Sequence, residues 1–318
     1  MTRPQGSQRP RRVGHCLLVV QVAAALAALC ACAAPVAAPT VDPQALDRER
    51  TRLATIALAS WEVEEQRVYA VSRRLLSTAL ERGTCAPARP DRGLLLESIA
   101  DLPEGLAAEV KKSNLRARGM AVIAVEPDGP AARAGVRVGD AVREVNGSAS
   151  TSADALPAAW KSGESIVLGI ESADGERQVT LGARPNCDVR VVMDDTHDIV
   201  ASTDSAGTIH VAQGIVQALQ DDDSLAFVIA HELGHRAHDD SAVVRLLASA
   251  RSRDQERQAD LFGIQLARAA GFDVQRIADV WDRLAQLDPD RVGQNWLEDH
   301  PLRAERSLRL REAIATVK

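Results

Sequence analysis

The residues best suited to chemistry lie together in the pentapeptide His231-Glu232-Leu233-Gly234-His235. Two histidines four positions apart stand on one face of a helix, where both imidazoles can reach one cation. Glu232 is turned away from that cation, so its carboxylate can reach a water bound there. The apolar run over 225–230 predicts a buried helix, and buried imidazoles require a partner. The motif therefore predicts a zinc site with a general base, rather than two solvated histidines.

A third ligand must come from elsewhere in the chain. The metzincin pattern would need Gly at 238 and His at 241, but these positions hold His238, which we expect to be solvated, and Ser241. Glu256 and Asp260 lie one turn apart further on. In gluzincins the third ligand is a glutamate from a following helix. By similarity to that pattern Glu256 would bind the metal, and Asp260 would accept the spare ring N–H of a ligand histidine. The alternative is that both acids are surface charges paired with neighbouring arginines.

Helices must position these residues, and the apolar periodicity predicts four of them: 224–238, 242–270 ended by Gly271, 274–287 and 301–317. Two strands, 188–192 and 207–211, are predicted before them. Near the N-terminus, apolar residues at mixed spacings of three and four predict a long amphipathic helix over 43–82 that ends at Gly83.

The middle of the chain has short β-like runs instead, including 120–125, 139–147 and a hairpin over 166–181 around Asp174-Gly175. The stretch Gly129-Pro-Ala-Ala-Arg-Ala-Gly-Val-Arg-Val-Gly-Asp140, followed by Val145-Asn-Gly147, resembles a bacterial PDZ domain. This resemblance implies the binding of extended, often C-terminal, peptides at a sheet edge, with the carboxylate-binding loop before Gly93. The alternative is a β domain that serves only as a spacer.

Cys85 and Cys187 lie just before and just after this PDZ-like segment. In an oxidising compartment an even pair of cysteines predicts a disulfide, the alternative being two unrelated thiols. A bridge here would join the two strands that cross at the neck of an inserted domain. The helix over 43–82 would then belong to the other domain.

The N-terminus predicts export from a bacterial cytoplasm. Four arginines and no acid occur in residues 1–31, and an apolar run over 13–34 follows the last of these arginines. Leu29-Cys30-Ala31-Cys32 resembles a lipobox with Cys32 as the lipidated residue, and Ala33 after it favours the outer membrane. Cleavage after a small residue, giving a soluble periplasmic protein, and an uncleaved anchor are the alternatives. We expect a membrane contact through a lipid anchor only.

Composition narrows the classes of function. Beyond residue 31 the chain carries 34 basic and 44 acidic residues, and only 3% of the whole sequence is aromatic. The excess of acidic residues and the few aromatic residues argue against nucleic acid as a partner.

The fold class we expect is α+β: a mostly helical zincin-type metallopeptidase domain with a small β-sheet, and an inserted PDZ-like β domain. The expected boundaries are 1–32 for the signal, 33–43 for a tether, 44–84 for the first peptidase helix, 92–184 for the PDZ-like domain and 187–318 for the peptidase domain.

Several motifs in the last part of the chain occur together and in order. They are the stretch 222–235, Glu256-Arg-Gln-Ala-Asp-Leu-Phe-Gly-Ile264, Ala269-Ala-Gly-Phe-Asp273 and His300-Pro301 with Arg306. Together they resemble the HtpX/BepA/Oma-type zinc metallopeptidases, a gluzincin family that includes the CAAX prenyl protease. The resemblance implies one Zn²⁺ per chain at His231, His235 and Glu256, with Glu232 as base. One departure is Val200-Ala201, where the family usually has Asn-Ala on an edge strand.

The resemblance implies hydrolysis of peptide bonds in protein or peptide substrates. A developing oxyanion needs one donor besides the metal, and His300 and Arg306 are the candidates. His300 is alternatively an inhibitory ligand at the open zinc position. We expect an envelope endopeptidase active in protein quality control; the alternative is an assembly or chaperone-like factor whose binding outweighs proteolysis. His197 and His210 are expected to be structural.

Overall fold

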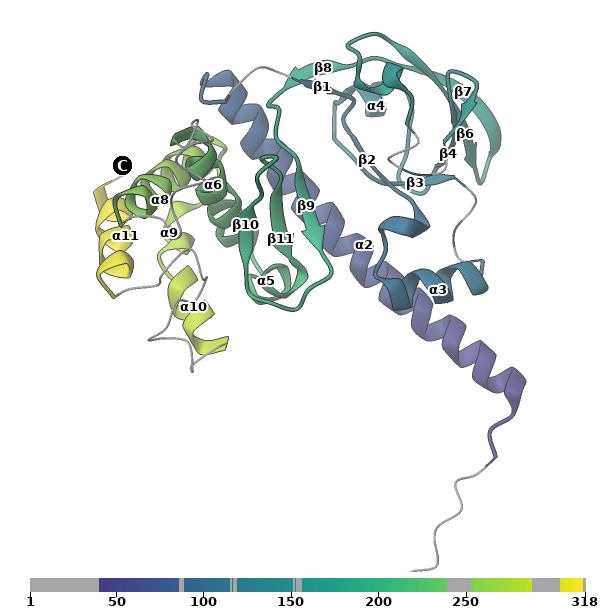
Figure 1. Cartoon of the computed structure of the whole chain (residues 1–318), viewed down its shortest axis with the longest axis horizontal. Helices are drawn as coiled ribbons and strands as arrows, with labels where there is room; N and C mark the ends of the chain where they lie inside the picture. Colours follow the sequence, from purple (N-terminus) through teal and green to yellow (C-terminus); the bar gives the residue numbers. More distant parts are fainter. Residues whose placement is uncertain are drawn as a thin grey trace, which may run out of the picture. The chain divides into compact units, whose positions relative to one another are not determined.

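A computed structural model of the chain describes residues 40–85, 89–114, 116, 119–150, 152, 156–238, 253–287 and 304–316 (Figure 1). Contacts divide the chain into two compact units, Met1–Arg48 and Glu49–Lys318. Helices and several β-sheets make the fold α+β, as predicted. No helix within the described ranges is both long and apolar enough to cross a membrane.

Helix α2 (Pro43–Glu81) is the long helix predicted over 43–82. Its buried residues recur mostly three or four positions apart and join the main hydrophobic core. The helix ends because Gly83 adopts a φ of +64°, which is costly for other residues. The N–H of Thr84 then bonds to the carbonyl of Ala79 at 2.9 Å, which satisfies a helix-end acceptor.

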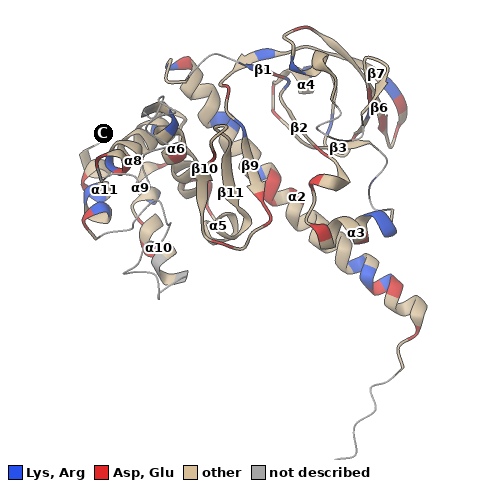
Figure 2. Ribbon diagram, viewed as in Figure 1, with Lys and Arg blue, Asp and Glu red and all other residues tan. Residues whose placement is uncertain are grey.

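Acidic and basic residues both lie along α2 and along α11 (Ala304–Thr316) (Figure 2). Exposed pairs such as Arg52–Glu49 at 2.6 Å and Arg309–Glu305 at 2.5 Å join neighbouring turns. Such pairs stabilise a helix by only a few tenths of a kcal/mol each. The helical conformation of α2 and α11 is therefore stabilised mainly by the packing of the buried face of each helix.

The PDZ-like domain is an antiparallel sheet in the order β2-β3-β4-β6-β7. Its strands are β2 (Leu94–Glu97), β3 (Met120–Val125), β4 (Ala141–Val145), β6 (Ile166–Ser172) and β7 (Gly175–Leu181), and β5 (Ser148–Ala149) pairs with β4. The turns lie where the sequence predicts them. Asn146 and Gly147 have φ values of +50° and +75° between β4 and β5, and Gly175 has a φ of +108° in the next hairpin.

Four short elements accompany this sheet: η1 (Ile99–Asp101), α3 (Glu104–Lys112), α4 (Pro130–Arg133) and η2 (Ala158–Lys161). Helix α3 is not predicted from the sequence. Its only fully buried residue is Val110, so the segment shows no clear apolar period. Its formation therefore depends on the surface against which it packs.

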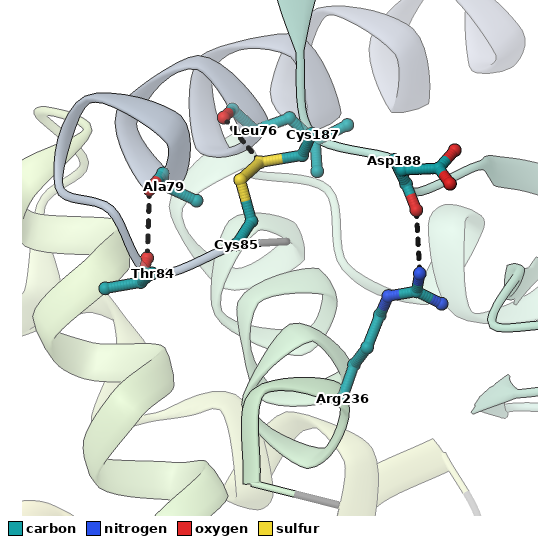
Figure 3. Close-up of a disulfide and its surroundings, with 7 residues drawn as sticks. All are labelled: Leu76, Ala79, Thr84, Cys85, Cys187, Asp188 and Arg236. Carbon is teal, nitrogen blue, oxygen red and sulfur yellow. Dashed lines mark hydrogen bonds between the residues drawn. A yellow bond between two sulfur atoms is a disulfide. The ribbon is translucent and has the colours of Figure 1, made fainter. Parts of the chain in front are cut away.

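The neck of the PDZ-like domain is closed by two short strands and a disulfide. Strand β1 (Arg89–Asp91) pairs antiparallel with β8 (Arg184–Asn186). The predicted disulfide is present between Cys85 and Cys187, whose Cα atoms are 5.7 Å apart (Figure 3). Sγ of Cys187 is buried 3.2 Å from the carbonyl oxygen of Leu76 on α2. The bond thus ties both crossing segments to the end of α2.

A second sheet precedes the motif helix, with the strand order β10-β11-β9. Strand β9 (Val191–Asp194) lies parallel to β11 (Ile209–Ala212), and β10 (Ala201–Thr203) is antiparallel to β11. The predicted strands 188–192 and 207–211 overlap β9 at residues 191–192 and β11 at residues 209–211, and β10 lies in the segment between them. Among the described strands β10 pairs with β11 only, so it forms one edge of this sheet.

The rest of the chain is helical: α5 (Gln213–Ala218), α6 (Asp222–His238), α8 (Arg253–Ala269), α9 (Val274–Ile277), α10 (Val280–Leu287) and α11. The single helix predicted over 274–287 is wrong, because two helices meet at Asp279. The N–H of Asp279 reaches only the carbonyl of Arg276, three residues back at 3.4 Å, while its carbonyl accepts from Arg283 to begin α10. Residues 242–252 and 301–303 of the predicted helices lie outside the described ranges.

Candidate metal centre

Helices α6 and α8 approach each other closely because glycine occupies two of their contact points. A Cβ atom on Gly234 would lie 2.9 Å from Cα of Ala259, and one on Gly263 would lie 3.2 Å from the backbone nitrogen of His231. Both separations are shorter than the usual contact between non-bonded heavy atoms. The two glycines therefore let the first turns of α8 face the histidines of α6.

The side chains of His231, His235 and Glu256 converge on one point. The Nε2 atoms of the two histidines are 2.9 Å apart. Oε2 of Glu256 lies 3.5 Å from Nε2 of His231, and Oε1 lies 3.3 Å from Nε2 of His235. These residues are between 3% and 5% exposed. Two imidazoles and a carboxylate thus face one another in a region shielded from water.

This arrangement fits a zinc ion. Nitrogen and oxygen ligands at the usual zinc distances are roughly 3.3 Å apart when the coordination is tetrahedral. The separations among His231, His235 and Glu256 run from 2.9 to 3.5 Å, on either side of that value. Two neutral imidazoles and one carboxylate are also a known donor set of catalytic zinc sites, where a fourth position remains for water.

Glu232 lies beside this donor set on α6 and is only 1% exposed. Ligand-type atoms of His231, Glu232 and His235 all lie within 4.8 Å of one another. Oε2 of Glu232 accepts a hydrogen bond of 2.9 Å from Oγ1 of Thr203, the last residue of β10. The carboxylate is therefore placed to take a proton from a water at the open position.

Asp260 and Arg306 lie behind the donor set. Oδ1 of Asp260 is 3.0 Å from Nδ1 of His231, on the opposite side of the ring from Nε2. Nε and Nη2 of Arg306 each donate to the Asp260 carboxylate at 2.7 Å, and Nη1 lies 2.9 Å from Oε2 of Glu256. The guanidinium also lies 4.6 Å from the centre of the Trp281 ring. Arg306 therefore connects the acids that hold the histidines.

The charge of Arg306 is stabilised although its side chain is only 8% exposed. Burial opposes the charged form, but the carboxylates of Asp260, Glu256 and Glu232 outweigh it and raise the pKa of the guanidinium. In this geometry Arg306 holds the carboxylates of Asp260 and Glu256 beside the histidines, and its predicted part as an oxyanion donor stays a prediction.

Glu256 and Asp260 are not surface charges, because they are 4% and 6% exposed. Arg257 instead pairs with the exposed Asp254 at 3.0 Å. The alternative of a solvated charge run on this helix is therefore wrong.

Of the other candidate residues, some lie within the described residues and some lie outside them. Cys32, His300 and the side chain of His238 lie outside the described residues, so the predictions for them stay predictions. Tyr69 lies on α2. His210 on β11 contacts Asp194 at 3.1 Å and Asp204 at 3.2 Å, apart from the metal centre.

Thr203 and Arg236 also contact this region, and neither is predicted from the sequence. Arg236 donates to the carbonyl oxygen of Asp188 at 2.7 Å (Figure 3). It also donates to the carbonyl oxygen of Gly207 at 2.8 Å. A threonine that ends a short strand, or an arginine one turn after a motif glutamate, carries no signature of its own in one sequence. Their contacts depend on how the hairpin β10–β11 packs on α6.

Two protein-family models match this chain. Residues 173–247 and 241–314 match Peptidase family M48, and residues 122–169 match the PDZ domain. The first match includes α6, α8 and most of α11, and the second includes strands from β3 to β6. None of the curated proteins gave a match to the chain.

Matches to solved structures fall on PDZ-containing proteins. The PDZ domain of HtrA3, bound to a phage-derived ligand, is 18% identical over 31% of this chain and 88% of that one, with a TM-score of 0.25. The HtrA-type protease AlgW with a decapeptide, and a variant of it, are each 21% identical over 31% and 36% of this chain, with TM-scores of 0.23 and 0.25. Those matches span 30% and 34% of the AlgW chains, about a third of their length.

Proposed function

We propose that this chain, an M48-family peptidase that carries a PDZ domain, is a zinc-dependent endopeptidase of the bacterial cell envelope. One observation carries the proposal. The side chains of His231, His235 and Glu256 face one buried point, and the carboxylate of Glu232 lies beside it. A purely structural zinc site has four protein ligands and no need of a base, whereas a hydrolytic site needs both an open position and a base.

The chain's residues have distinct parts in peptide hydrolysis. When bound, zinc supplies a water of lowered pKa and polarises the substrate carbonyl. Glu232 accepts the proton of the attacking water and passes it to the leaving amine. Asp260 accepts the Nδ1 proton of His231, which leaves the Nε2 lone pair directed at the donor set. Arg306 holds Asp260 and Glu256 in place from behind.

We place the substrate along β10. This strand is an edge of its sheet among the described strands, and its last residue, Thr203, contacts Glu232. An extended peptide added to an edge strand forms backbone hydrogen bonds that depend little on its sequence. Val200 stands where the family usually has Asn, and this change of side chain removes no backbone donor or acceptor, so pairing along β10 does not need that Asn. Substrates would therefore be unfolded or extended segments of proteins.

The PDZ domain would supply a second, separate contact with substrates. Strand β2 is an outer strand of the PDZ sheet, and PDZ domains bind peptides by adding a strand at such an edge. We propose that it binds the C-terminal ends of envelope proteins. A matched pair of peptides tests this: the peptide with a free C-terminal carboxylate should bind more tightly than the same peptide amidated at its C-terminus.

The envelope location rests on the N-terminal sequence and on the disulfide. A basic segment followed by an apolar run is typical of an export signal, and the bond between Cys85 and Cys187 suits an oxidising compartment. We propose lipidation at Cys32 and attachment to the outer membrane. Palmitate labelling of the wild type, lost in Cys32→Ser, is the expected result, and labelling that survives the substitution would contradict it.

The central experiment measures zinc content and casein hydrolysis of the purified full chain and of Glu232→Gln. We expect one zinc per chain in both proteins and a kcat roughly 10²- to 10⁴-fold lower in the variant. Glu176→Gln, an exposed change on β7, is the matched control and should hydrolyse casein normally. A protein without zinc, or an unchanged rate in Glu232→Gln, would refute the proposed mechanism.

The second candidate function is an envelope assembly factor whose binding outweighs proteolysis. The peptide-binding domain favours it, but the base beside the donor set does not. Complementation of a deletion strain separates the two. Full rescue by Glu232→Gln would support the assembly factor, and failure to rescue by a stable Glu232→Gln protein would support the peptidase.

A further inference from the structure

A hydrogen bond connects the edge strand to the base. Oγ1 of Thr203 lies 2.9 Å from Oε2 of Glu232, and the two residues are 29 positions apart in the sequence. An ionised carboxylate only accepts hydrogen bonds, so the threonine hydroxyl is the donor. Hydrogen bonds to charged groups are about twice as strong as those between neutral groups, and burial of Glu232 at 1% exposure strengthens this one.

A second contact holds the same hairpin to the same face of α6. Arg236 lies one helical turn after Glu232, and its Nη1 donates to the carbonyl of Gly207 at 2.8 Å. Gly207 has a φ of +83°, and a Cβ atom there would lie 1.4 Å from Nη1 of Arg236. Any side chain at position 207 would displace the guanidinium of Arg236 from this position.

The turn between the two contact points is itself closed by hydrogen bonds. The N–H of Asp204 bonds to the carbonyl of Thr208 at 2.9 Å, and the N–H of Thr208 bonds to Oδ1 of Asp204 at 2.8 Å. Thr203 therefore ends a strand that leads directly into a hydrogen-bonded turn. Two contacts therefore connect the hairpin to the helix: Thr203 with Glu232, and Gly207 with Arg236.

We propose that Thr203 is a positioning residue for Glu232. Its hydroxyl holds Oε2, which restricts rotation of the carboxylate about its last bond and gives Oε1 one orientation toward the attacking water. Because Thr203 ends the strand along which the substrate is placed, the same residue sets the register between the substrate and the base. This inference rests on the proposed peptidase function and adds to it a residue that contacts neither metal nor the reacting atoms.

The test compares Thr203→Val, which keeps the shape of threonine and removes the donor, with Thr203→Ser, which keeps the donor. We expect Thr203→Val to lower kcat roughly tenfold with KM within about twofold of the wild type. Thr203→Ser should recover kcat to within about threefold. Thr180→Val, an exposed change on β7 of the PDZ-like domain, is the matched control. In a Glu232→Gln background Thr203→Val should lower kcat little further, because both changes act through one group.

A measurement without substrate separates this inference from the proposed function. Thr203→Val should lower the folding equilibrium constant roughly 10- to 100-fold in the wild type and hardly at all in a Glu232→Ala background. If the wild type hydrolyses nothing, the proposed function fails while this coupling still reports on the contact. The inference itself is overturned by an absent coupling, by an unchanged kcat in Thr203→Val, by equal losses in Thr203→Ser and Thr203→Val, or by an effect confined to KM.

Discussion

Oδ1 of Asp260 lies 3.0 Å from Nδ1 of His231, while the same carboxylate accepts two hydrogen bonds of 2.7 Å from Arg306. One acid therefore fixes the orientation of a ligand ring and is itself fixed by a buried cation. Such outer contacts typically change metal affinity by factors of about 10–100 when they are removed. His231, Asp260 and Arg306 thus connect α6, α8 and α11 at one point.

Asp260→Ala is expected to weaken zinc binding about 10- to 100-fold, because His231 loses the acceptor of its ring proton and Arg306 loses its main partner. Competition with a chromogenic zinc chelator measures this directly, without any substrate. Asp254→Asn, at an exposed acid on the same helix, should leave the affinity unchanged. An affinity equal to that of the wild type in Asp260→Ala would show that Asp260 does not support the ligand.

Gly234→Ala is expected to destabilise the fold by about 1–3 kcal/mol, since the new Cβ would press on the backbone of Ala259. Urea denaturation measures the free energy of unfolding. Gly105→Ala is a suitable control, because it lies in helix α3 with open space around the added Cβ. There the substitution should be neutral or stabilising by up to about 1 kcal/mol. Equal behaviour of the two variants would contradict a close contact of α6 with α8.

Loss of the disulfide is expected to destabilise the protein by about 3–5 kcal/mol. The bond joins residues 102 positions apart, so it closes a long loop in the unfolded chain. Unfolding of the wild type and of the Cys85→Ser, Cys187→Ser double variant, each with and without reductant, measures the effect. Reductant should shift the wild type alone, and a reductant shift of similar size in the double variant would assign the effect to another cause.

The contribution of His210 to stability is expected to depend on pH. Burial by itself lowers the pKa of His210, but hydrogen bonds and charges of Asp194 and Asp204 outweigh it, so the pKa is raised. A histidine whose pKa is higher in the folded than in the unfolded protein stabilises the fold. This stabilisation is fully present below the pKa of the unfolded chain, about 6.5, and disappears as the pH rises through the pKa of the folded protein. His210→Gln should therefore destabilise more at about pH 5.5 than at about pH 9. The opposite trend in urea denaturation would show that this pair of acids does not hold the charged imidazole.

Much of the local structure follows from the sequence because it depends on neighbouring residues only. The helical repeat places His231 and His235 on one face whatever surrounds them. Likewise Gly83 ends α2, and Asn146-Gly147 turns a hairpin, because of backbone freedom at those positions. Motif order also predicted the likeness to Peptidase family M48 and to the PDZ domain that the family models match, and the position of two cysteines around an inserted segment predicted the disulfide.

The sequence predicted Glu256 and Asp260 beside the histidines, but it did not predict the packing that brings them there or the contacts of Thr203 and Arg306. Glu256 reaches the histidines because Gly234 and Gly263 let two helices approach, and that approach is a property of packing. Arg306 meets Asp260, and Thr203 meets Glu232, across 46 and 29 positions of chain. The sequence by itself determined which groups are present and how adjacent ones are spaced, because short-range geometry is set by the backbone. Only the tertiary structure decided which distant side chains share a buried space, because that depends on how all the elements pack at once.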